Sequence, residues 1–473
     1  MVVNTNFLFE NNKNYIYKIN DENFILFNPV IQSWIALDYI GKEIVEAIQK
    51  NKNIEDSVQA LSKKFHIADD EIYNDVKPFV DELIAKRFFL NERPEYEKTW
   101  MEKEFSVSDI RKIYPLNDIY IGITDACNLN CIYCFNHENR YTRLKSNLSN
   151  MGDAEVFNII KQYKELGGKG VVFTGGEPTL NPHLVNYARY AIESGLVPRM
   201  ITNGTNLLNI DLKELLRYMN DISISLDSVI IEELTKLWNV DCRNKLNDLF
   251  EALKIIDNIS KDSNKPVNIV ISPIVSRVNI GSICKVIKYS KEKLSNCNVR
   301  WNFTPYGKIG KNEIDEALSV TPDEYYINYL EAWRKSVPAA NDMMLKYFAS
   351  TEGGKRELKK RPNFVACTPA FFVNNKGFIY PCQGLENEEH LLGNINNVTL
   401  KEAYESAIMD NVIKSAMISN YNKCSECELR FLCTLKNGAC SKNDEVYKCK
   451  ERMHTIMFYK SKFNGSICGN KSI

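Results

Sequence analysis

The middle of the chain, residues 115–315, alternates short apolar runs with longer amphipathic segments. The short runs are rich in β-branched residues and predict strands, and the longer segments repeat their apolar residues at helical spacing. Strands that alternate with helices favour a parallel sheet covered by helices. The predicted strands are Ile119–Thr124, Gly170–Thr174, Arg199–Thr202, Asp221–Leu226, Val267–Val275 and Val299–Phe303, and the predicted helices are Asp153–Leu166, His183–Ser194, Leu212–Met219, Leu246–Asn258 and Ile280–Lys293.

Six predicted strands, rather than the eight of a closed barrel, indicate an α/β fold of the partial (β/α)6 TIM-like type. Such a barrel is open on one side, and its mouth is wide enough for a peptide. Because barrels of this class carry their chemistry at the C-terminal ends of the strands, functional residues are expected there.

The N-terminal residues 1–95 show a different pattern. Two strand-like runs, Tyr15–Ile19 and Phe24–Asn28, predict a hairpin, and three helical stretches follow at Gly41–Lys50, Ile54–Phe65 and Asp69–Phe88. This order fits a small helical cap on the enzyme, and a winged-helix-like domain is what the family resemblance described below implies for the same residues. The remaining boundaries are a linker at 96–114, a helical bridge at 316–360, a cysteine-rich domain at 361–455 and a tail at 456–473.

Composition narrows the class of protein. Of 473 residues, 44% are hydrophobic and 25% charged, which is typical of a soluble globular protein. The 60 basic and 60 acidic residues cancel, so neither a nucleic acid nor a membrane is expected as a partner. With no signal-peptide pattern at the start, we expect a cytoplasmic protein. Its 14 cysteines then favour metal or cluster ligation, because the cytoplasm keeps thiols reduced.

Three of these cysteines directly follow the first predicted strand. Cys127, Cys131 and Cys134 have the spacing C-x3-C-x2-C, which places three thiolates on one short loop. Soft sulfur ligands select iron-sulfur clusters or zinc. A cubane cluster has four irons, so three protein ligands leave one iron free to bind another molecule. A zinc loop and a buried cysteine cluster remain alternatives on this motif alone.

The motif resembles that of the radical S-adenosylmethionine (radical SAM) family, C-x3-C-x-aromatic-C, with Tyr133 as the aromatic residue. The resemblance implies a catalytic 4Fe-4S cluster on Cys127, Cys131 and Cys134, whose free iron chelates the amino and carboxylate groups of S-adenosylmethionine. It also implies that Tyr133 lies against the adenine. The resemblance implies further cofactor contacts at Gly175, Gly176, Glu177, Asn203, Ser225 and Asp227. For these residues an ordinary glycine turn and solvent-facing loop positions remain the alternatives.

Seven cysteines near the C-terminus form two groups, C-x9-G-x4-C and C-x2-C-x5-C-x6-C-x8-C. They resemble the SPASM extension of radical SAM enzymes, except that C-x6-C replaces C-x3-C. The resemblance implies two auxiliary 4Fe-4S clusters, and hence three clusters in all. The second auxiliary cluster has an open iron or takes a fourth ligand from Cys242, Cys284, Cys297 or Cys468. The implied ligands are Cys424, Cys427, Cys433 and Cys449 for one cluster, and Cys367, Cys382 and Cys440 for the other.

The run from Asp75 to Leu83, together with the hairpin and helices around it, resembles a RiPP recognition element, a domain that binds the leader of a ribosomally made precursor peptide.

Together the resemblances imply a peptide maturase supplied with electrons by flavodoxin or ferredoxin. Its 5'-deoxyadenosyl radical would drive thioether formation, as in sactipeptide and ranthipeptide maturases. Other open alternatives are C-C or C-O cross-linking, epimerisation, side-chain oxidation, a radical SAM enzyme for a small molecule, and a non-catalytic zinc or electron-transfer protein.

Overall fold

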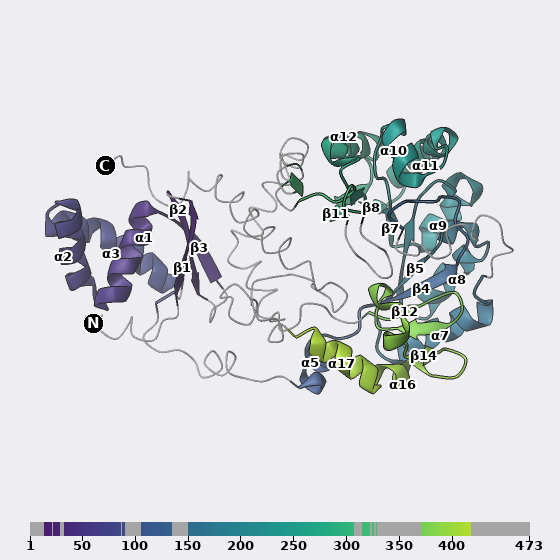
Figure 1. The fold of residues 1–473 in the computed structure, drawn as a ribbon, viewed down its shortest axis with the longest axis horizontal. Helices are drawn as coiled ribbons and strands as arrows, with labels where there is room; N and C mark the ends of the chain where they lie inside the picture. Colours follow the sequence, from purple (N-terminus) through teal and green to yellow (C-terminus); the bar gives the residue numbers. More distant parts are fainter. Residues whose placement is uncertain are drawn as a thin grey trace.

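The computed structural model describes residues 14–20, 22–28, 33–86, 88–89, 106–134, 150–306, 315–321, 324–325, 328 and 370–417. Within these ranges the N-terminal unit and the large sheet each have their own hydrophobic core (Figure 1). No helix of the described ranges is long and apolar enough to cross a membrane.

The N-terminal unit is a three-stranded antiparallel sheet covered on one face by three helices (Figure 1). The third strand was missed from the sequence, because it leads into the first helix without a turn residue between them. Asp38, the last residue of that strand, caps the helix by accepting a hydrogen bond from the Gly41 N–H at 2.7 Å. The elements are β1 (Tyr15–Asn20), β2 (Asn23–Asn28), β3 (Ser33–Asp38), α1 (Tyr39–Asn51), α2 (Ile54–Phe65) and α3 (Asp69–Ala85).

All six predicted strands of the middle region are present, and they are parallel neighbours in one open sheet. The β7 strand is shorter than predicted, since it ends at Ile224. Two short strands continue β8 and β10 as a separate parallel pair. The bounds are β4 (Asp118–Thr124), β5 (Gly170–Gly175), β6 (Val197–Thr202), β7 (Asp221–Ile224), β8 (Asn268–Ile271), β9 (Ile274–Val275), β10 (Asn298–Trp301) and β11 (Thr304–Pro305).

Helices cover one face of this sheet, where alternate strand residues such as Ile119, Met200 and Ile222 are buried. The five predicted helices are present, and α10 was not predicted. The helices are α7 (Asp153–Glu165), α8 (Leu184–Glu193), α9 (Leu212–Tyr218), α10 (Ile231–Trp238), α11 (Arg243–Lys261) and α12 (Ile283–Lys293), with 3-10 turns η3 (Pro178–Leu180), η4 (Leu207–Asn209) and η5 (Ile280–Ser282).

The C-terminal segment extends the same sheet. Its strand β12 pairs in parallel with β4, through Phe372 opposite Tyr120, and two antiparallel strands follow. This sheet extension was not foreseen, because β12 has only two residues. The elements are β12 (Phe372–Val373), β13 (Phe378–Tyr380), η6 (Gln383–Leu385), η7 (Glu388–His390), β14 (Gly393–Asn394), α16 (Leu400–Tyr404) and α17 (Ala407–Ser415).

Part of the segment expected as a linker, residues 96–114, forms helix α5 (Val107–Ile113). Ser106 and Asp109 form a capping box at its start, and Ile110 is buried in the large core. Arg111 forms an ion pair with Asp410 of α17 at 2.7 Å. The N-terminal side of the large domain and the C-terminal segment are therefore packed together around α5.

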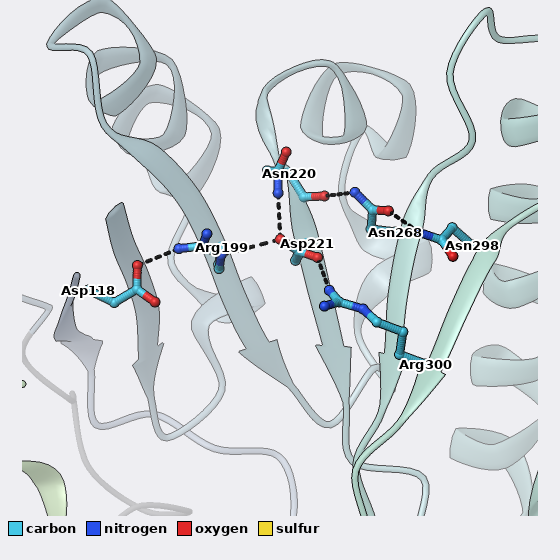
Figure 2. Close-up of polar contacts among 7 residues, drawn as sticks. All are labelled: Asp118, Arg199, Asn220, Asp221, Asn268, Asn298 and Arg300. Atoms are coloured by element: carbon cyan, nitrogen blue, oxygen red, sulfur yellow. Dashed lines mark hydrogen bonds and ion pairs between the residues drawn. The ribbon is translucent and has the colours of Figure 1, made fainter. Parts of the chain in front are cut away.

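A chain of charges crosses the N-terminal ends of the parallel strands, on the face opposite the covering helices (Figure 2). Arg199 of β6 bonds to both Asp118 of β4 and Asp221 of β7, and Arg300 of β10 also bonds to Asp221. Strand β5 lies between β4 and β6 and contributes Gly170 at this level. A Cβ at Gly170 would overlap Asp118 Oδ1 and the Arg199 guanidinium, so these two side chains, in their observed positions, leave no room for a side chain at residue 170.

We expect Gly170→Ala to destabilise the folded enzyme by at most about 1 kcal/mol, because a Cβ would displace the ends of two flexible, partly exposed side chains and weaken their ion pair. Gly281→Ala is the matched control, because a Cβ at Gly281 would meet no atom within 4 Å. Thermal unfolding followed by circular dichroism measures both variants. Equal unfolding temperatures would show that the charge chain does not depend on the space at Gly170.

Candidate functional site

The three cysteines of the predicted cluster motif lie on the loop that follows β4 at the C-terminal edge of the sheet. Each of them is partly buried. The Cys134 N–H donates to the Cys131 carbonyl at 3.1 Å, which closes a turn between the last two thiols. The sequence therefore places this loop where the fold was expected to put its chemistry.

Gly175 and Gly176 hold the cysteine loop by close backbone contact. The Gly176 N–H donates to the Thr124 carbonyl at 2.8 Å, and the next N–H, of Glu177, donates to the Ala126 carbonyl at 2.6 Å. A Cβ at Gly175 would overlap the Thr124 carbonyl, and one at Gly176 would overlap that of Ala126. Gly175 also has φ of +135°, a conformation that only glycine adopts readily. These glycines therefore set the position of the loop.

The Glu177 carboxylate is fully buried and accepts four hydrogen bonds from the described residues. Thr179 donates its N–H and hydroxyl to Oε1 at 3.1 and 2.6 Å, the Thr202 hydroxyl donates to Oε1 at 2.7 Å, and the Asn203 N–H donates to Oε2 at 2.7 Å. Burial raises the pKa of Glu177, and these hydrogen bonds oppose that effect. The carboxylate thus joins the ends of β5 and β6.

Asn203 connects this arrangement to the cysteine loop. Its Nδ2 donates to Asn128 Oδ1 at 2.9 Å, and the Thr205 N–H and hydroxyl donate to its Oδ1 at 2.9 and 2.7 Å. Asn128, which lies one residue after Cys127, completes the network by donating to the Thr205 hydroxyl at 2.8 Å. Asn128 was not singled out from the sequence, because nothing in its local pattern marks it.

Asp227 lies after the end of β7 and is 2% exposed. The Tyr133 hydroxyl and the Trp238 indole N–H donate to its Oδ2, the latter at 2.8 Å, and the Ile274 N–H donates to Oδ1 at 2.8 Å. Burial raises the pKa of Asp227 to about 6, against the lowering effect of these bonds. The expected ribose contact of Asp227 stays a prediction.

Ser225 was expected to share a strand face with Asp227, but the two residues differ in environment. The Leu226 N–H donates to the Ile224 carbonyl at 3.0 Å, so the chain turns after β7 and the strand alternation stops there. Ser225 is half-buried, and no described residue hydrogen-bonds its hydroxyl. Of the two predicted ribose contacts, Ser225 therefore has the side chain that is available to a ligand.

The residues of the cysteine loop fit an iron-sulfur cluster in their chemistry. Burial, the charge of Asp227, and the charges of Cys127 and Cys134 together raise the pKa of Cys131 well above its usual value. Cationic iron would offset this cost of three neighbouring thiolates. Within the described ranges no three Cys, His, Asp or Glu side chains are grouped to hold a single metal ion. A four-iron cluster has a different requirement, because each cysteine binds a separate iron.

Only one predicted ligand of the auxiliary clusters, Cys382, lies in the described residues. It follows β13, which runs antiparallel to β12 and hence to β4. Cys382 therefore lies toward the N-terminal ends of the parallel strands, and the Cys127 loop lies at their C-terminal ends.

Among the proposed fourth ligands, Cys242 is fully buried with Thr235 Oγ1 3.1 Å from its sulfur, and burial raises the pKa of Cys297 to about 11. Cys284 packs at the edge of a small core, and outside the described residues lie Cys367, Cys424, Cys427, Cys433, Cys440, Cys449 and Cys468.

Comparison with known families agrees with this arrangement. Residues 121–285 match the Radical SAM superfamily, residues 23–88 match Coenzyme PQQ synthesis protein D (PqqD), and residues 367–428 match the iron-sulfur cluster-binding domain SPASM. The chain is a radical SAM enzyme. The resemblance inferred from the cysteine motif is confirmed, and so are the SPASM extension and the PqqD-type recognition element at the N-terminus.

Two curated relatives each align with about two thirds of this radical SAM enzyme. It is 26% identical over 355 residues to the cysteine-type anaerobic sulfatase-maturating enzyme of Clostridium perfringens, covering 69% of this chain and 89% of the relative. It is 24% identical over 331 residues to the AdoMet-dependent heme synthase of Methanosarcina barkeri, covering 66% and 88%. Because these two relatives are named for different reactions, they do not identify the substrate of this enzyme.

Among solved structures, one described as native anSMEcpe with bound AdoMet and Cp18Cys peptide has a TM-score of 0.53 and 23% identity. The match covers 73% of this chain and 97% of that chain. It confirms the α/β radical SAM fold with a mostly parallel sheet.

We expect Glu177→Gln to destabilise this radical SAM enzyme by about 1–3 kcal/mol, because the amide would turn an N–H group toward donors that now meet an acceptor. Glu165→Gln, at an exposed position at the end of α7, is the control. Urea denaturation of both variants measures the difference. Equal stability of the two variants would contradict the role given to the buried carboxylate.

Proposed function

We propose that this radical SAM enzyme matures a ribosomally made precursor peptide by forming thioether cross-links between cysteine thiols and carbon atoms of other residues. The observation that carries the proposal is the combination of a PqqD-type unit, a cysteine loop at the C-terminal edge of the sheet, and a SPASM segment. The similarity to a relative named as a sulfatase-maturating enzyme supports a protein or peptide substrate.

In this proposal Cys127, Cys131 and Cys134 hold the catalytic cluster. The bound cluster and S-adenosylmethionine supply a 5'-deoxyadenosyl radical that removes a hydrogen atom from the substrate. The chain positions the cofactor through the backbone of Gly175–Glu177, through Asn203 and Ser225, and through the ring of Tyr133 against the adenine. The second and third clusters belong to the SPASM domain, and flavodoxin or ferredoxin supplies electrons in the cytoplasm.

The N-terminal unit is proposed to bind the leader of the precursor in a winged-helix-like manner. Its three strands are in the order β1-β2-β3, so β1 and β3 are the edge strands of the described sheet. A strand at the edge of a sheet offers unpaired backbone groups to an extended peptide. Main-chain pairing of this kind would tether the precursor and raise the effective concentration of its core at the barrel mouth.

The thioether step conserves atoms and electrons. The substrate carbon gives a hydrogen atom to the deoxyadenosyl group, the thiol gives up its proton, and the carbon-sulfur bond forms with release of one electron. Clusters held by the SPASM cysteines would accept that electron. Each link therefore removes two hydrogens from the peptide.

Replacement of single cysteines separates the two parts of this function. Cys134→Ala should abolish formation of 5'-deoxyadenosine, because it removes a ligand of the catalytic cluster. Cys424→Ala should retain that cleavage and lose the cross-link. Chromatography of deoxyadenosine and mass spectrometry of the peptide measure both. An unchanged peptide product from Cys424→Ala would contradict the role assigned to the SPASM domain.

The type of linkage is tested by expressing the enzyme without oxygen together with a cysteine-bearing peptide encoded beside its gene. The mass of the peptide is then measured before and after thiol alkylation. Thioether formation predicts a loss of two hydrogens per link and an equal number of thiols that no longer alkylate. The same peptide without its leader is the control and should be modified poorly. If hydrogens are lost while every thiol still reacts, the link is C-C or C-O instead.

A further inference from the structure

The buried carboxylate of Asp227 joins the cysteine loop to two other parts of the fold. It accepts from the Tyr133 hydroxyl, from the Trp238 indole at 2.8 Å and from the Ile274 N–H at 2.8 Å. The backbone of Asp227 is held as well, because Asn279 Nδ2 donates to its carbonyl at 2.8 Å. Asp227, Tyr133, Trp238 and Ile274 are called the Asp227 clamp below.

Helix α10 also holds the cysteine loop through the backbone. The helix ends at Trp238, because Asn239 adopts the left-handed conformation with φ of 50°. Carbonyls in the last turn of a helix have no partner within the helix. Here those of Leu237 and Trp238 accept from the N–H groups of Ile132 at 2.9 Å and Asn130 at 3.1 Å. The end of α10 thus fixes the segment between Cys127 and Cys134 from one side.

Two of the clamp residues are too buried to act directly on a ligand. Trp238 is fully buried and Asp227 is 2% exposed, whereas Tyr133 is partly exposed beside Cys134. The side-chain contacts therefore run from the buried indole of Trp238, through the Asp227 carboxylate, to the half-buried side chain of Tyr133, while Ile274 takes part only through its backbone N–H. Outer partners of this kind orient the groups that bind a metal centre or its ligand.

We propose that Asp227 and Trp238 are positioning residues that orient Tyr133, and with it the side of the cysteine loop that binds S-adenosylmethionine. This inference rests on the proposed function, and it gives Asp227 a role other than contact with the ribose. Neither residue of the pair needs to touch the cofactor for its loss to weaken cofactor binding.

The test uses Trp238→Phe, which removes the indole N–H and keeps an aromatic ring. Trp301→Phe is the matched control. The indole of Trp301, on β10, also donates to a side-chain oxygen, Ser290 Oγ of α12, at 2.9 Å. The iron-loaded proteins are titrated with S-adenosylmethionine, and the electron paramagnetic resonance spectrum of the reduced cluster is recorded with and without it. Iron content and unfolding temperature are measured in parallel.

We expect Trp238→Phe and Tyr133→Phe each to weaken S-adenosylmethionine binding about tenfold. Both should change the spectral response to S-adenosylmethionine while iron content stays at that of the unmodified enzyme. Trp301→Phe should bind S-adenosylmethionine normally. If Trp238→Phe binds as Trp301→Phe does, the clamp has no positioning role.

A double-mutant cycle separates positioning from direct contact. If Asp227 acts through Tyr133, Asp227→Asn adds no further loss of affinity to Tyr133→Phe. If the two losses add, Asp227 acts on the ligand by itself and the inference is wrong. Absence of any S-adenosylmethionine response in the unmodified iron-loaded enzyme would overturn the proposed function as well, whereas failure of the variants alone overturns only the clamp.

Discussion

The site depends on one close approach, that of the cysteine loop to the backbone of the next strand end. At Gly175 and Gly176 the two chain segments are so close that no side chain fits between them. The N–H groups of residues 176 and 177 bond to carbonyls of the loop. This contact fixes where the loop leaves β4, and every other feature of the site is built around it.

Two buried carboxylates then connect the loop to the rest of the sheet. Glu177, two residues after β5, accepts bonds from η3 and from the end of β6. Asp227 accepts bonds from the cysteine loop, from α10 and from the start of β9. A carboxylate can accept several hydrogen bonds at once, and leaving such a group buried without them would be costly. Each carboxylate therefore specifies the relative position of the segments that donate to it.

The SPASM segment is joined to the catalytic domain as part of one sheet. Strand β12 pairs with β4, the strand that leads into the cysteine loop, and α5 contacts α17 on the outer side. Because β13 returns antiparallel, Cys382 is directed toward the other edge of the sheet.

Hydrophobic periodicity and motif spacing are local properties, so the sequence alone predicted the six parallel strands, the covering helices other than α10, and the place of Cys127, Cys131 and Cys134. It missed β3 and β12, which have no turn residue or are too short to show a period. The parts played by Asn128 and Trp238 were decided only by the tertiary structure, since their partners are Thr205 and Asp227, far along the chain or across a helix. Buried polar contacts of this kind form between segments that only folding brings together, so no local pattern reveals them.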